Sequence, residues 1–315
     1  MSRYYKPLVY VVPPEEDGLL LRTVLQKRMG VSRKLLSRLK LTEQGITVNG
    51  ERKYIDVKLR GGDRVEARME QETSDDIMPQ PMTLDILYED DDLLVLNKPP
   101  GIVVHPTHGH YTNTLANGVV HHWLEHGESF RFRPVHRLDQ ETSGTLAVAK
   151  NPYVHQQISE ELQRHEVKKE YLAIVHGSVV LDKGTIDEPI DRDPQQPHVR
   201  IVTEAGYPAV THYYVERRFP AATLVRLRLE TGRTHQIRVH MQHLGHPLLG
   251  DKMYGYADLP GRESAPDAFG LERQALHAFR LGLTHPMTRQ WMEFEAPLPE
   301  DMASCLERLE RLERL

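Results

Sequence analysis

The sequence has one cysteine and no long hydrophobic run, and both absences exclude classes of protein. A single cysteine, Cys305, cannot form a disulfide within the chain and is a poor start for a metal site. No stretch approaches the ~18 uncharged apolar residues of a membrane-spanning helix, and residues 1–17 lack the apolar core and cleavage site of a signal peptide. We therefore expect a cytoplasmic protein without a membrane partner.

The chain also lacks an overall excess of positive charge. Its net charge of −5 argues against a protein whose whole surface contacts nucleic-acid phosphates. Basic residues are instead concentrated between positions 22 and 40, where no Asp or Glu occurs, whereas acidic residues dominate from 70 to 92. With 315 residues, 39% of them hydrophobic and 27% charged, the composition is that of a folded protein of about two domains.

Residues 1–67 have the pattern of a small domain. Two apolar runs at helical spacing are separated by Gly30, and the Asn49-Gly50 and Gly61-Gly62-Asp63 turns predict a β-ribbon. This order resembles the alpha-L type of RNA-binding domain, first seen in a ribosomal small-subunit protein. The resemblance implies phosphate contacts from the basic second helix; the alternative is an ordinary solvated helix face. The residues concerned are Arg33, Lys34, Arg38 and Lys40.

Three further segments complete the predicted organisation. Residues 68–83 are polar and acidic and contain Pro79 and Pro81, so we expect a semi-extended linker that holds the small domain at a variable distance. Residues 84–300 contain many short strands and few helices, which predicts an α+β fold with a mixed, largely antiparallel sheet. Residues 301–315 repeat Leu-Glu-Arg and are expected to form a solvated helical tail rather than a partner-binding helix.

Asp139 is the strongest candidate for chemistry. It lies in a predicted turn before a buried strand, and Gly144 follows at a place where backbone is expected to approach a ligand closely. An aspartate in a turn is by itself more often structural. However, His-Arg-Leu-Asp followed by Glu-Thr-Ser-Gly resembles the signature of the RluA-type RNA pseudouridine synthases. The segments at 95–106, 168–177 and 229–255 resemble that family in the same order.

The resemblance covers about residues 84–297 and implies the chemistry. Such enzymes detach uracil from its ribose, rotate it and rejoin it through carbon 5, which needs no cofactor. Asp139 would be the essential carboxylate, acting on the sugar as nucleophile or as base, an alternative that the sequence leaves open. Arg238 would pair with Asp139 and favour its charged form, and Tyr171 would stack on the uracil and help to remove the proton from carbon 5.

RNA contacts are expected around this site. A target uridine in folded RNA is stacked, so the enzyme must extrude it. The resemblance implies that Arg137 enters the RNA stack, which suits a planar guanidinium. The other residues expected to contact RNA or to support the cleft are His136, Arg233, His235, Lys98 and His105.

Two other interpretations remain open. Histidines cluster at His105, His108 and His110 and again between His235 and His246, but neither group has the His-Glu-x-x-His pattern, so we expect no metal rather than a metal-dependent hydrolase. A non-catalytic RNA-binding or ribosome-assembly factor would not require Asp139. We expect a monomeric, cofactor-free enzyme of structured RNA, with large-subunit ribosomal RNA preferred over transfer RNA because of the appended basic domain.

Overall fold

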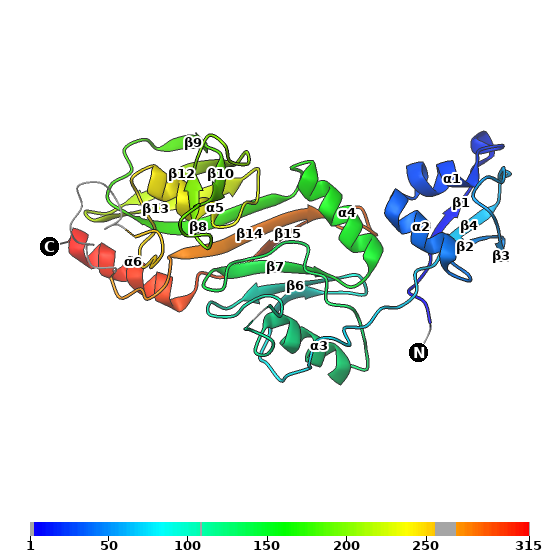
Figure 1. Ribbon diagram of the computed structural model, residues 1–315, viewed down its shortest axis with the longest axis horizontal. Helices are drawn as coiled ribbons and strands as arrows, with labels where there is room; N and C mark the ends of the chain where they lie inside the picture. Colours follow the sequence, from blue (N-terminus) through cyan, green and yellow to red (C-terminus); the bar gives the residue numbers. More distant parts are fainter. Residues whose placement is uncertain (1–2, 108, 256–268, 315) are drawn as a thin grey trace.

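The computed structural model describes residues 3–107, 109–255 and 269–314. A small N-terminal unit stands at one end of an elongated molecule, and the larger unit is built on one long sheet (Figure 1). None of the helices in the described ranges is long and apolar enough to cross a membrane.

The small unit is a four-stranded sheet with short helices on it. Its sheet has the order β1-β4-β2-β3. Helix α2 (Arg33–Leu41) begins at Ser32, whose side chain accepts a hydrogen bond from the N–H of Leu35, and it buries three leucines while its basic side chains stay exposed. The other elements are β1 (Leu8–Val11), η1 (Pro14–Glu16), α1 (Leu21–Thr23), η2 (Val24–Arg28), β2 (Ile46–Val48), β3 (Glu51–Arg52) and β4 (Arg64–Ala67).

Two details of this unit differ from the sequence pattern. The predicted first helix is one α-helical turn, α1, continued by the π-helical segment η2. The predicted ribbon is also wider than expected, because β1 pairs along the whole of β4, with Leu8 opposite Ala67. Strand β1 was missed because Leu-Val-Tyr-Val is too short to show an alternating pattern.

The larger unit confirms the mixed, largely antiparallel sheet. Its strands follow the order β5-β6-β7-β14-β8-β13-β12-β9, with β15 paired to β14, and β7 with β14 is the parallel pair in this path. The strands are β5 (Asp85–Glu89), β6 (Leu93–Lys98), β7 (Ser143–Ala149), β8 (Lys168–His176), β9 (Lys183–Asp187), β12 (Val210–Arg218), β13 (Ala222–Leu229), β14 (Leu276–Thr284) and β15 (Trp291–Glu295); β10 (Ile190–Arg192) and β11 (Arg200–Val202) form a separate ribbon.

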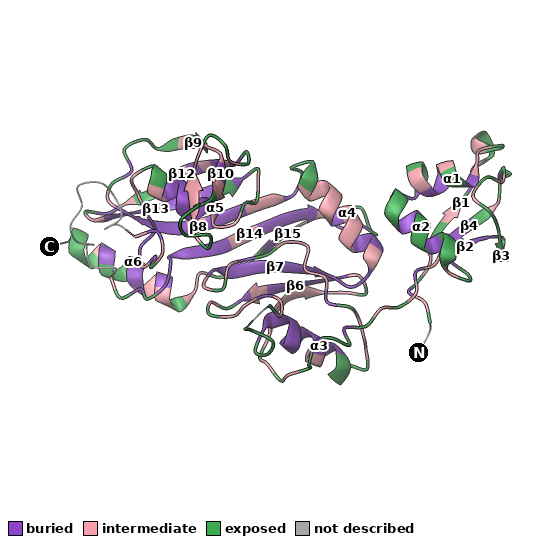
Figure 2. Cartoon of the chain, in the orientation of Figure 1, coloured by how far each residue is buried: buried purple, intermediate pink, exposed green. Residues whose placement is uncertain are grey.

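Helices cover both faces of the sheet. On β7, Leu146 and Val148 pack in the core that includes α3 (Leu115–Glu125) and α5 (Gln236–His243), while Ala147 and Ala149 pack in the core that includes α4 (Pro152–Gln163). Every residue of β7 is therefore buried, as Figure 2 shows for the centre of the sheet. A strand covered on both faces gives the turn that precedes it a rigid support.

The C-terminal residues form a helix, α6 (Glu300–Glu313), but the expectation of a solvated tail is wrong. Met302, Cys305 and Leu309 are fully buried and pack in one core with Ile174 and Leu249. The three-residue repeat hides this face because Met302 and Cys305 precede it, at the helical spacings that continue to Leu309.

The segment 68–83 is packed against the larger unit, so the predicted variable distance is also wrong. Glu72 forms ion pairs with Arg38 of the small unit and with Arg133 of the large one. The hydroxyl of Ser74 accepts a hydrogen bond from the backbone N–H of Phe132 at 2.7 Å, and Ile77 is buried in the core beneath α3. The polar composition of this segment predicted a linker. Its contacts with the large unit were not predicted, because Phe132 and Arg133 lie far from it in the sequence.

The small unit also docks directly on α4. The Tyr153 hydroxyl donates to the carbonyl of Met29 at 2.9 Å, and the amides of Gln156 and Gln157 donate to the carbonyl of Gly30 at 2.8 and 2.9 Å. One end of α4 therefore contacts the turn just before α2, and its other end runs toward the centre of the long sheet (Figure 1).

Candidate active site

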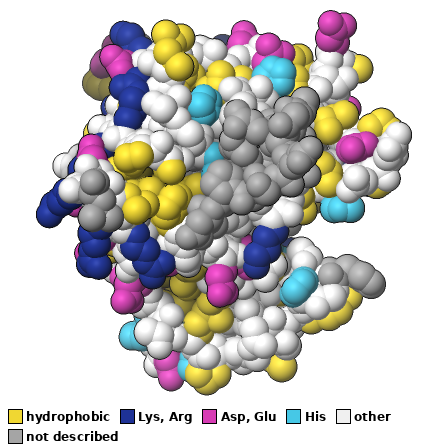
Figure 3. Space-filling model, turned by 90° about the vertical axis from the view of Figure 1, so that its left-hand side faces the viewer, with side chains coloured by type: hydrophobic (Ala, Val, Ile, Leu, Met, Phe, Trp, Pro, Cys, Tyr) yellow, Lys and Arg dark blue, Asp and Glu magenta, His cyan; other side chains and the backbone are white. Residues whose placement is uncertain are grey.

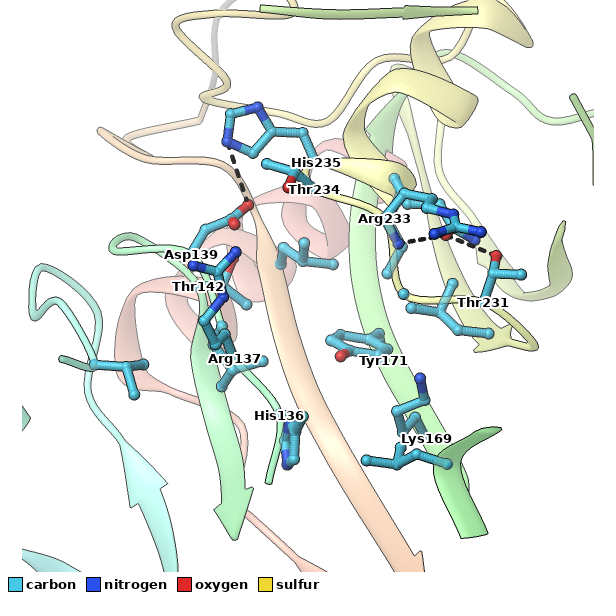
Figure 4. Close-up of a pocket in the computed structure, with 18 of the residues that line it drawn as sticks. His136, Arg137, Asp139, Thr142, Lys169, Tyr171, Thr231, Arg233, Thr234 and His235 are labelled. Carbon is cyan, nitrogen blue, oxygen red and sulfur yellow. Dashed lines mark hydrogen bonds and ion pairs between the residues drawn. The ribbon is translucent and has the colours of Figure 1, made fainter. Parts of the chain in front are cut away.

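A pocket of about 770 Å³ opens at the centre of the long sheet. It is lined by the turn before β7, by β8, by the end of α4 and by the segment 229–238. Figure 4 shows Asp139, Arg137, Tyr171 and His235 around the same open space, although they come from three distant parts of the chain. The structure thus brings together Asp139, Tyr171 and Arg238, as well as Arg137, His136, Arg233 and His235.

Asp139 lies in a hydrogen-bonded turn, as predicted, with the N–H of Thr142 donating to its carbonyl at 3.1 Å. Arg273 supports this turn from below, since its guanidinium donates to the carbonyl of Glu141 at 2.9 Å and pairs with Asp301 of α6. Gly144 then has φ +113°, and a Cβ there would lie 2.2 Å from the carbonyl oxygen of Ala278. The glycine is therefore required because β14 approaches closely at this position. The expectation that it lets the backbone approach a ligand is wrong.

Arg238 lies beside Asp139 but is held by another carboxylate. Its Nη1 is 3.6 Å from Oδ2 of Asp139. Its Nε and Nη2 donate to the two oxygens of Asp251 at 2.7 and 2.8 Å, a bidentate pair. The backbone N–H groups of Met253 and Tyr254 also donate to Asp251 at 2.9 and 3.0 Å, so this carboxylate is fully bonded.

The electrostatic balance keeps this pair charged. Burial alone would lower the pKa of Arg238, but the hydrogen bond from its guanidinium to Asp251 and the charges of Asp251 and Asp139 outweigh burial and raise it. Burial alone would raise the pKa of Asp251, and the bonds and charge of Arg238 reverse this. A fixed positive charge consequently faces Asp139 at the inner end of the pocket.

His235 completes the surroundings of Asp139. Its Nε2 is 3.9 Å from Oδ2 of Asp139, and its backbone is left-handed, with φ +57°, at the start of α5. The hydroxyl of Tyr254 accepts a bond from the N–H of Arg200 at 2.8 Å, so its own proton is available to Nδ1 of His235, 2.9 Å away. Burial lowers the pKa of His235, so the ring is neutral and presents Nε2–H toward the carboxylate.

Tyr171 forms part of the wall opposite Asp139. It is buried on β8, and burial together with the negative charge of Asp139 raises the pKa of its hydroxyl. The phenol is therefore protonated at neutral pH. A protonated phenol can stack on a base and form a hydrogen bond with it. It cannot itself act as the base that removes a proton, because only the phenolate could do so.

Three further predicted residues lie at or near the pocket, and one of them, Lys98, does not face it. Lys98 is fully buried, and its ammonium donates to the carbonyls of Pro99, Ile102 and Gln140 at 2.8 to 2.9 Å, so it ties two loops together instead of facing the cleft. Burial lowers its pKa to about 7. The ring of His136 lines the pocket and burial lowers its pKa to about 3, so it is neutral. His105 lines the pocket and packs on Phe132 with ring centroids 5.9 Å apart.

The remaining predicted RNA contacts are exposed. Arg137 is exposed at the pocket, and Arg233, also exposed, lies over the ring of Tyr207 at 5.6 Å. The basic residues of α2 lie outside the pocket, on the small unit. Among them, Arg38 forms the ion pair with Glu72, so its charge is partly compensated.

Sequence reasoning missed four residues that hold the site. Asp251 and Tyr254 lie within the segment 229–255 that resembles the family. The spacing of residues in that segment does not predict that Asp251 binds the guanidinium of Arg238. Gln236 is buried and accepts bonds from the Thr231 hydroxyl and the Arg233 N–H at 2.8 and 2.9 Å, which fixes the turn before α5. Arg273 lies outside the recognised segments and only its fold position connects it to Asp139.

Within the described ranges, no group of three or more His, Cys, Asp or Glu side chains is arranged to hold a metal ion. His240 bonds instead to the hydroxyl of Thr211 and the carbonyl of Glu188, both at 2.9 Å. His108 of the first histidine group lies outside the described residues.

Comparison with known proteins agrees with this site. Residues 92–243 match the family model described as RNA pseudouridylate synthase. The chain is 46% identical over 269 residues to the uncharacterized RNA pseudouridine synthase YlyB of Bacillus subtilis, covering 84% of this chain and 86% of that one. It is 42% identical over 275 residues to ribosomal large subunit pseudouridine synthase D of Escherichia coli, covering 85% and 83%.

A solved structure is also similar. Human RNA pseudouridylate synthase domain containing 1 superposes with a TM-score of 0.58 at 27% identity, covering 75% of this chain and 97% of the human one. The Asp139 signature, the ordered segments and these relatives agree, and the chain belongs to the RluA-type RNA pseudouridine synthases, enzymes that isomerise uridine in RNA.

Proposed function

We propose that this enzyme isomerises uridines of large-subunit ribosomal RNA, with Asp139 as the catalytic carboxylate. The observation that carries the catalytic role is the Asp139–Arg238 contact at 3.6 Å inside the pocket, with Arg238 locked by Asp251. The substrate rests on coarser support, namely the identity of 42% to a relative named for the large ribosomal subunit. The two relatives described above are bacterial, which supports a location of this enzyme in the cytoplasm. The expectation that the enzyme is a monomer remains part of the proposal.

In this proposal, Asp139 acts on the ribose of an extruded uridine. The side chain is 30% exposed in the open pocket, and an entering nucleotide would exclude the remaining water. Arg238 faces this carboxylate with a positive charge that is held in place by Asp251 rather than supplied by a mobile side chain. A carboxylate serves equally as a nucleophile or as a base.

Tyr171 is proposed to stack on the uracil and to orient it during rotation. The raised pKa of its hydroxyl, caused by burial and by Asp139, makes the phenol a hydrogen-bond partner rather than a ready base. Removal of the proton from carbon 5 through Tyr171 would then require that the phenol pass its own proton on. Arg137, exposed at the pocket, is proposed to fill the space that the extruded base leaves.

The small unit is proposed to anchor the RNA. Helix α4 contacts the turn before α2 through Tyr153 and Gln156 and reaches the pocket at Gln163, so the helix rise sets a separation of about 15 Å along α4. A short RNA hairpin easily spans this distance. RNA phosphates on α2 would therefore contribute affinity without contacting the reacting base.

The substrate proposal is tested by tritium release from RNA labelled at carbon 5 of uracil. Transcripts of bacterial large-subunit ribosomal RNA, small-subunit ribosomal RNA and transfer RNA are supplied separately, and release from the large-subunit transcript is expected. Release confined to transfer RNA would contradict the substrate proposal and leave the enzyme class intact.

A charge-removal variant tests the anchor. Replacing Arg33, Lys34 and Lys40 of α2 together by Gln is expected to weaken RNA binding and to reduce the slope of log K against log salt by about 2 to 3, because each lost phosphate contact removes ~0.7–0.9 from that slope. Fluorescence anisotropy across a potassium chloride series measures both quantities.

The matched control replaces Lys183, Arg192 and Arg311, three exposed basic residues of β9, β10 and α6 at the opposite end of the molecule. Basic and acidic side chains are interspersed around that end (Figure 3). An equal loss of affinity in the control variant would contradict a special role for α2.

A further inference from the structure

Strand β8 presents alternate residues to opposite faces of the sheet. Lys169 and Tyr171 line the pocket and lie one above the other on the same strand (Figure 4). Lys168 and Glu170 belong to the opposite face, where they are paired. Glu170 accepts bonds from Arg226 and Arg280, both at 3.1 Å, and Lys168 lies 3.3 Å from Glu293.

Lys169 differs from its neighbours because its ammonium has no partner among the described residues. Within residues 3–107, 109–255 and 269–314, neither a carboxylate nor a carbonyl forms a hydrogen bond or an ion pair with it. Burial lowers its pKa, as expected for a cation without compensation. It points into the pocket beside the 231–233 turn, where a Cβ on Gly232 would lie 3.6 Å from Nζ.

Among the described residues, both carboxylates that line the pocket already have other partners. Its described lining contains two, Asp139 and Glu230. Asp139 lies against Arg238 and His235, and Glu230 forms a 2.7 Å contact with His212. Four cationic side chains line the same space, namely Arg137, Lys169, Arg233 and Arg238. The pocket is thus prepared to receive negative charge.

We propose that Lys169 binds a phosphate of the RNA backbone adjacent to the extruded uridine, so that Lys169 with the 231–233 turn forms an anion subsite within the active site. This inference rests on the proposed reaction at Asp139. It concerns substrate positioning and does not depend on which RNA is modified.

The chemistry of the cation favours phosphate over the uracil ring. A nucleotide that fills the pocket removes the remaining water from Lys169, and an ammonium left without a counter-charge in such a place is costly. The carbonyl groups of uracil are neutral and would not balance it, whereas each nucleotide brings one phosphodiester charge. A lysine suits this role as a compact point charge with three donors.

Three variants test the subsite, each assayed on whichever transcript releases tritium with the wild type. Lys169→Met is expected to lower kcat/KM about 10- to 100-fold, the size of a lost charge-assisted contact, and to reduce the salt slope of log kcat/KM by about 0.7–0.9. Lys169→Arg retains a charge that does not titrate and is expected to restore kcat/KM to within about threefold of the wild type. Lys168→Met, on the opposite face, is expected to keep both values.

The unfolding temperature separates binding from a structural role. Because Lys169→Met removes an uncompensated cation, it is expected to unfold at the same temperature as the wild type or a higher one. Wild-type kcat/KM and salt slope in Lys169→Met would overturn the proposal, as would a loss of activity that merely follows a loss of stability. Equal impairment of Lys169→Arg and Lys169→Met would also overturn the proposal. It would indicate that Lys169 transfers a proton, which Arg cannot do, rather than that it binds a phosphate. Failure of the reaction itself would appear separately, as loss of tritium release in the wild type.

Discussion

Asp139→Asn is expected to reduce tritium release by at least about 1,000-fold, because the reaction loses its carboxylate while the side chain keeps its size. RNA affinity is expected to stay within about threefold of the wild type, since binding depends on cationic surfaces. Single-turnover tritium release and fluorescence anisotropy on the same RNA measure the two effects.

The structure explains why this substitution should not disturb the pocket. Arg238 remains bound to both oxygens of Asp251 when the charge of Asp139 is lost, so no buried cation is left unpaired. Glu141→Gln is the matched control, because Glu141 lies two residues further along the same turn and its hydrogen bond with Arg273 is made by the backbone carbonyl, which the substitution keeps. Turnover that persists in Asp139→Asn would refute the catalytic assignment, and an equal loss in Glu141→Gln would trace the effect to the turn.

Asp251→Asn is expected to have the largest effect on stability. The carboxylate is 0% exposed and binds Arg238 through two bonds, and breaking such a buried pair costs about 3–5 kcal/mol in free energy of unfolding. The reaction should also slow by about 100-fold, since a guanidinium that shifts by 1 Å no longer holds Asp139 correctly. Urea unfolding and tritium release measure these two quantities.

A second Arg–Asp pair provides the control for this substitution. Arg218 lies 2.7 Å from Asp182, the same separation as the Arg238–Asp251 pair, but Asp182 is 86% exposed. Asp182→Asn is therefore expected to change stability by at most about 1 kcal/mol and to leave turnover unchanged. Equal stability losses in the two variants would show that burial of Asp251 does not set the strength of its pair with Arg238.

The sequence by itself determined the class of fold and the central residue of the site. Many short strand-like segments with few helices between them predicted the largely antiparallel sheet, because parallel neighbours need long crossover connections that are usually helices. Asp139 was identified because its flanking residues form an unbroken signature. The turn around it is local, and local turns are encoded by neighbouring residues.

Only the tertiary structure decided which distant groups meet. The Asp251 carboxylate that holds Arg238, the Arg273 that supports the turn of Asp139, and the carbonyls that surround Lys98 all depend on contacts between separate segments. The same is true of residues 68–83 and α6, whose composition predicted solvated segments but whose side chains found partners in the sheet. Periodicity and composition describe a single segment and indicate which of its residues favour burial. The partners of a charged or buried side chain depend on how the whole chain packs.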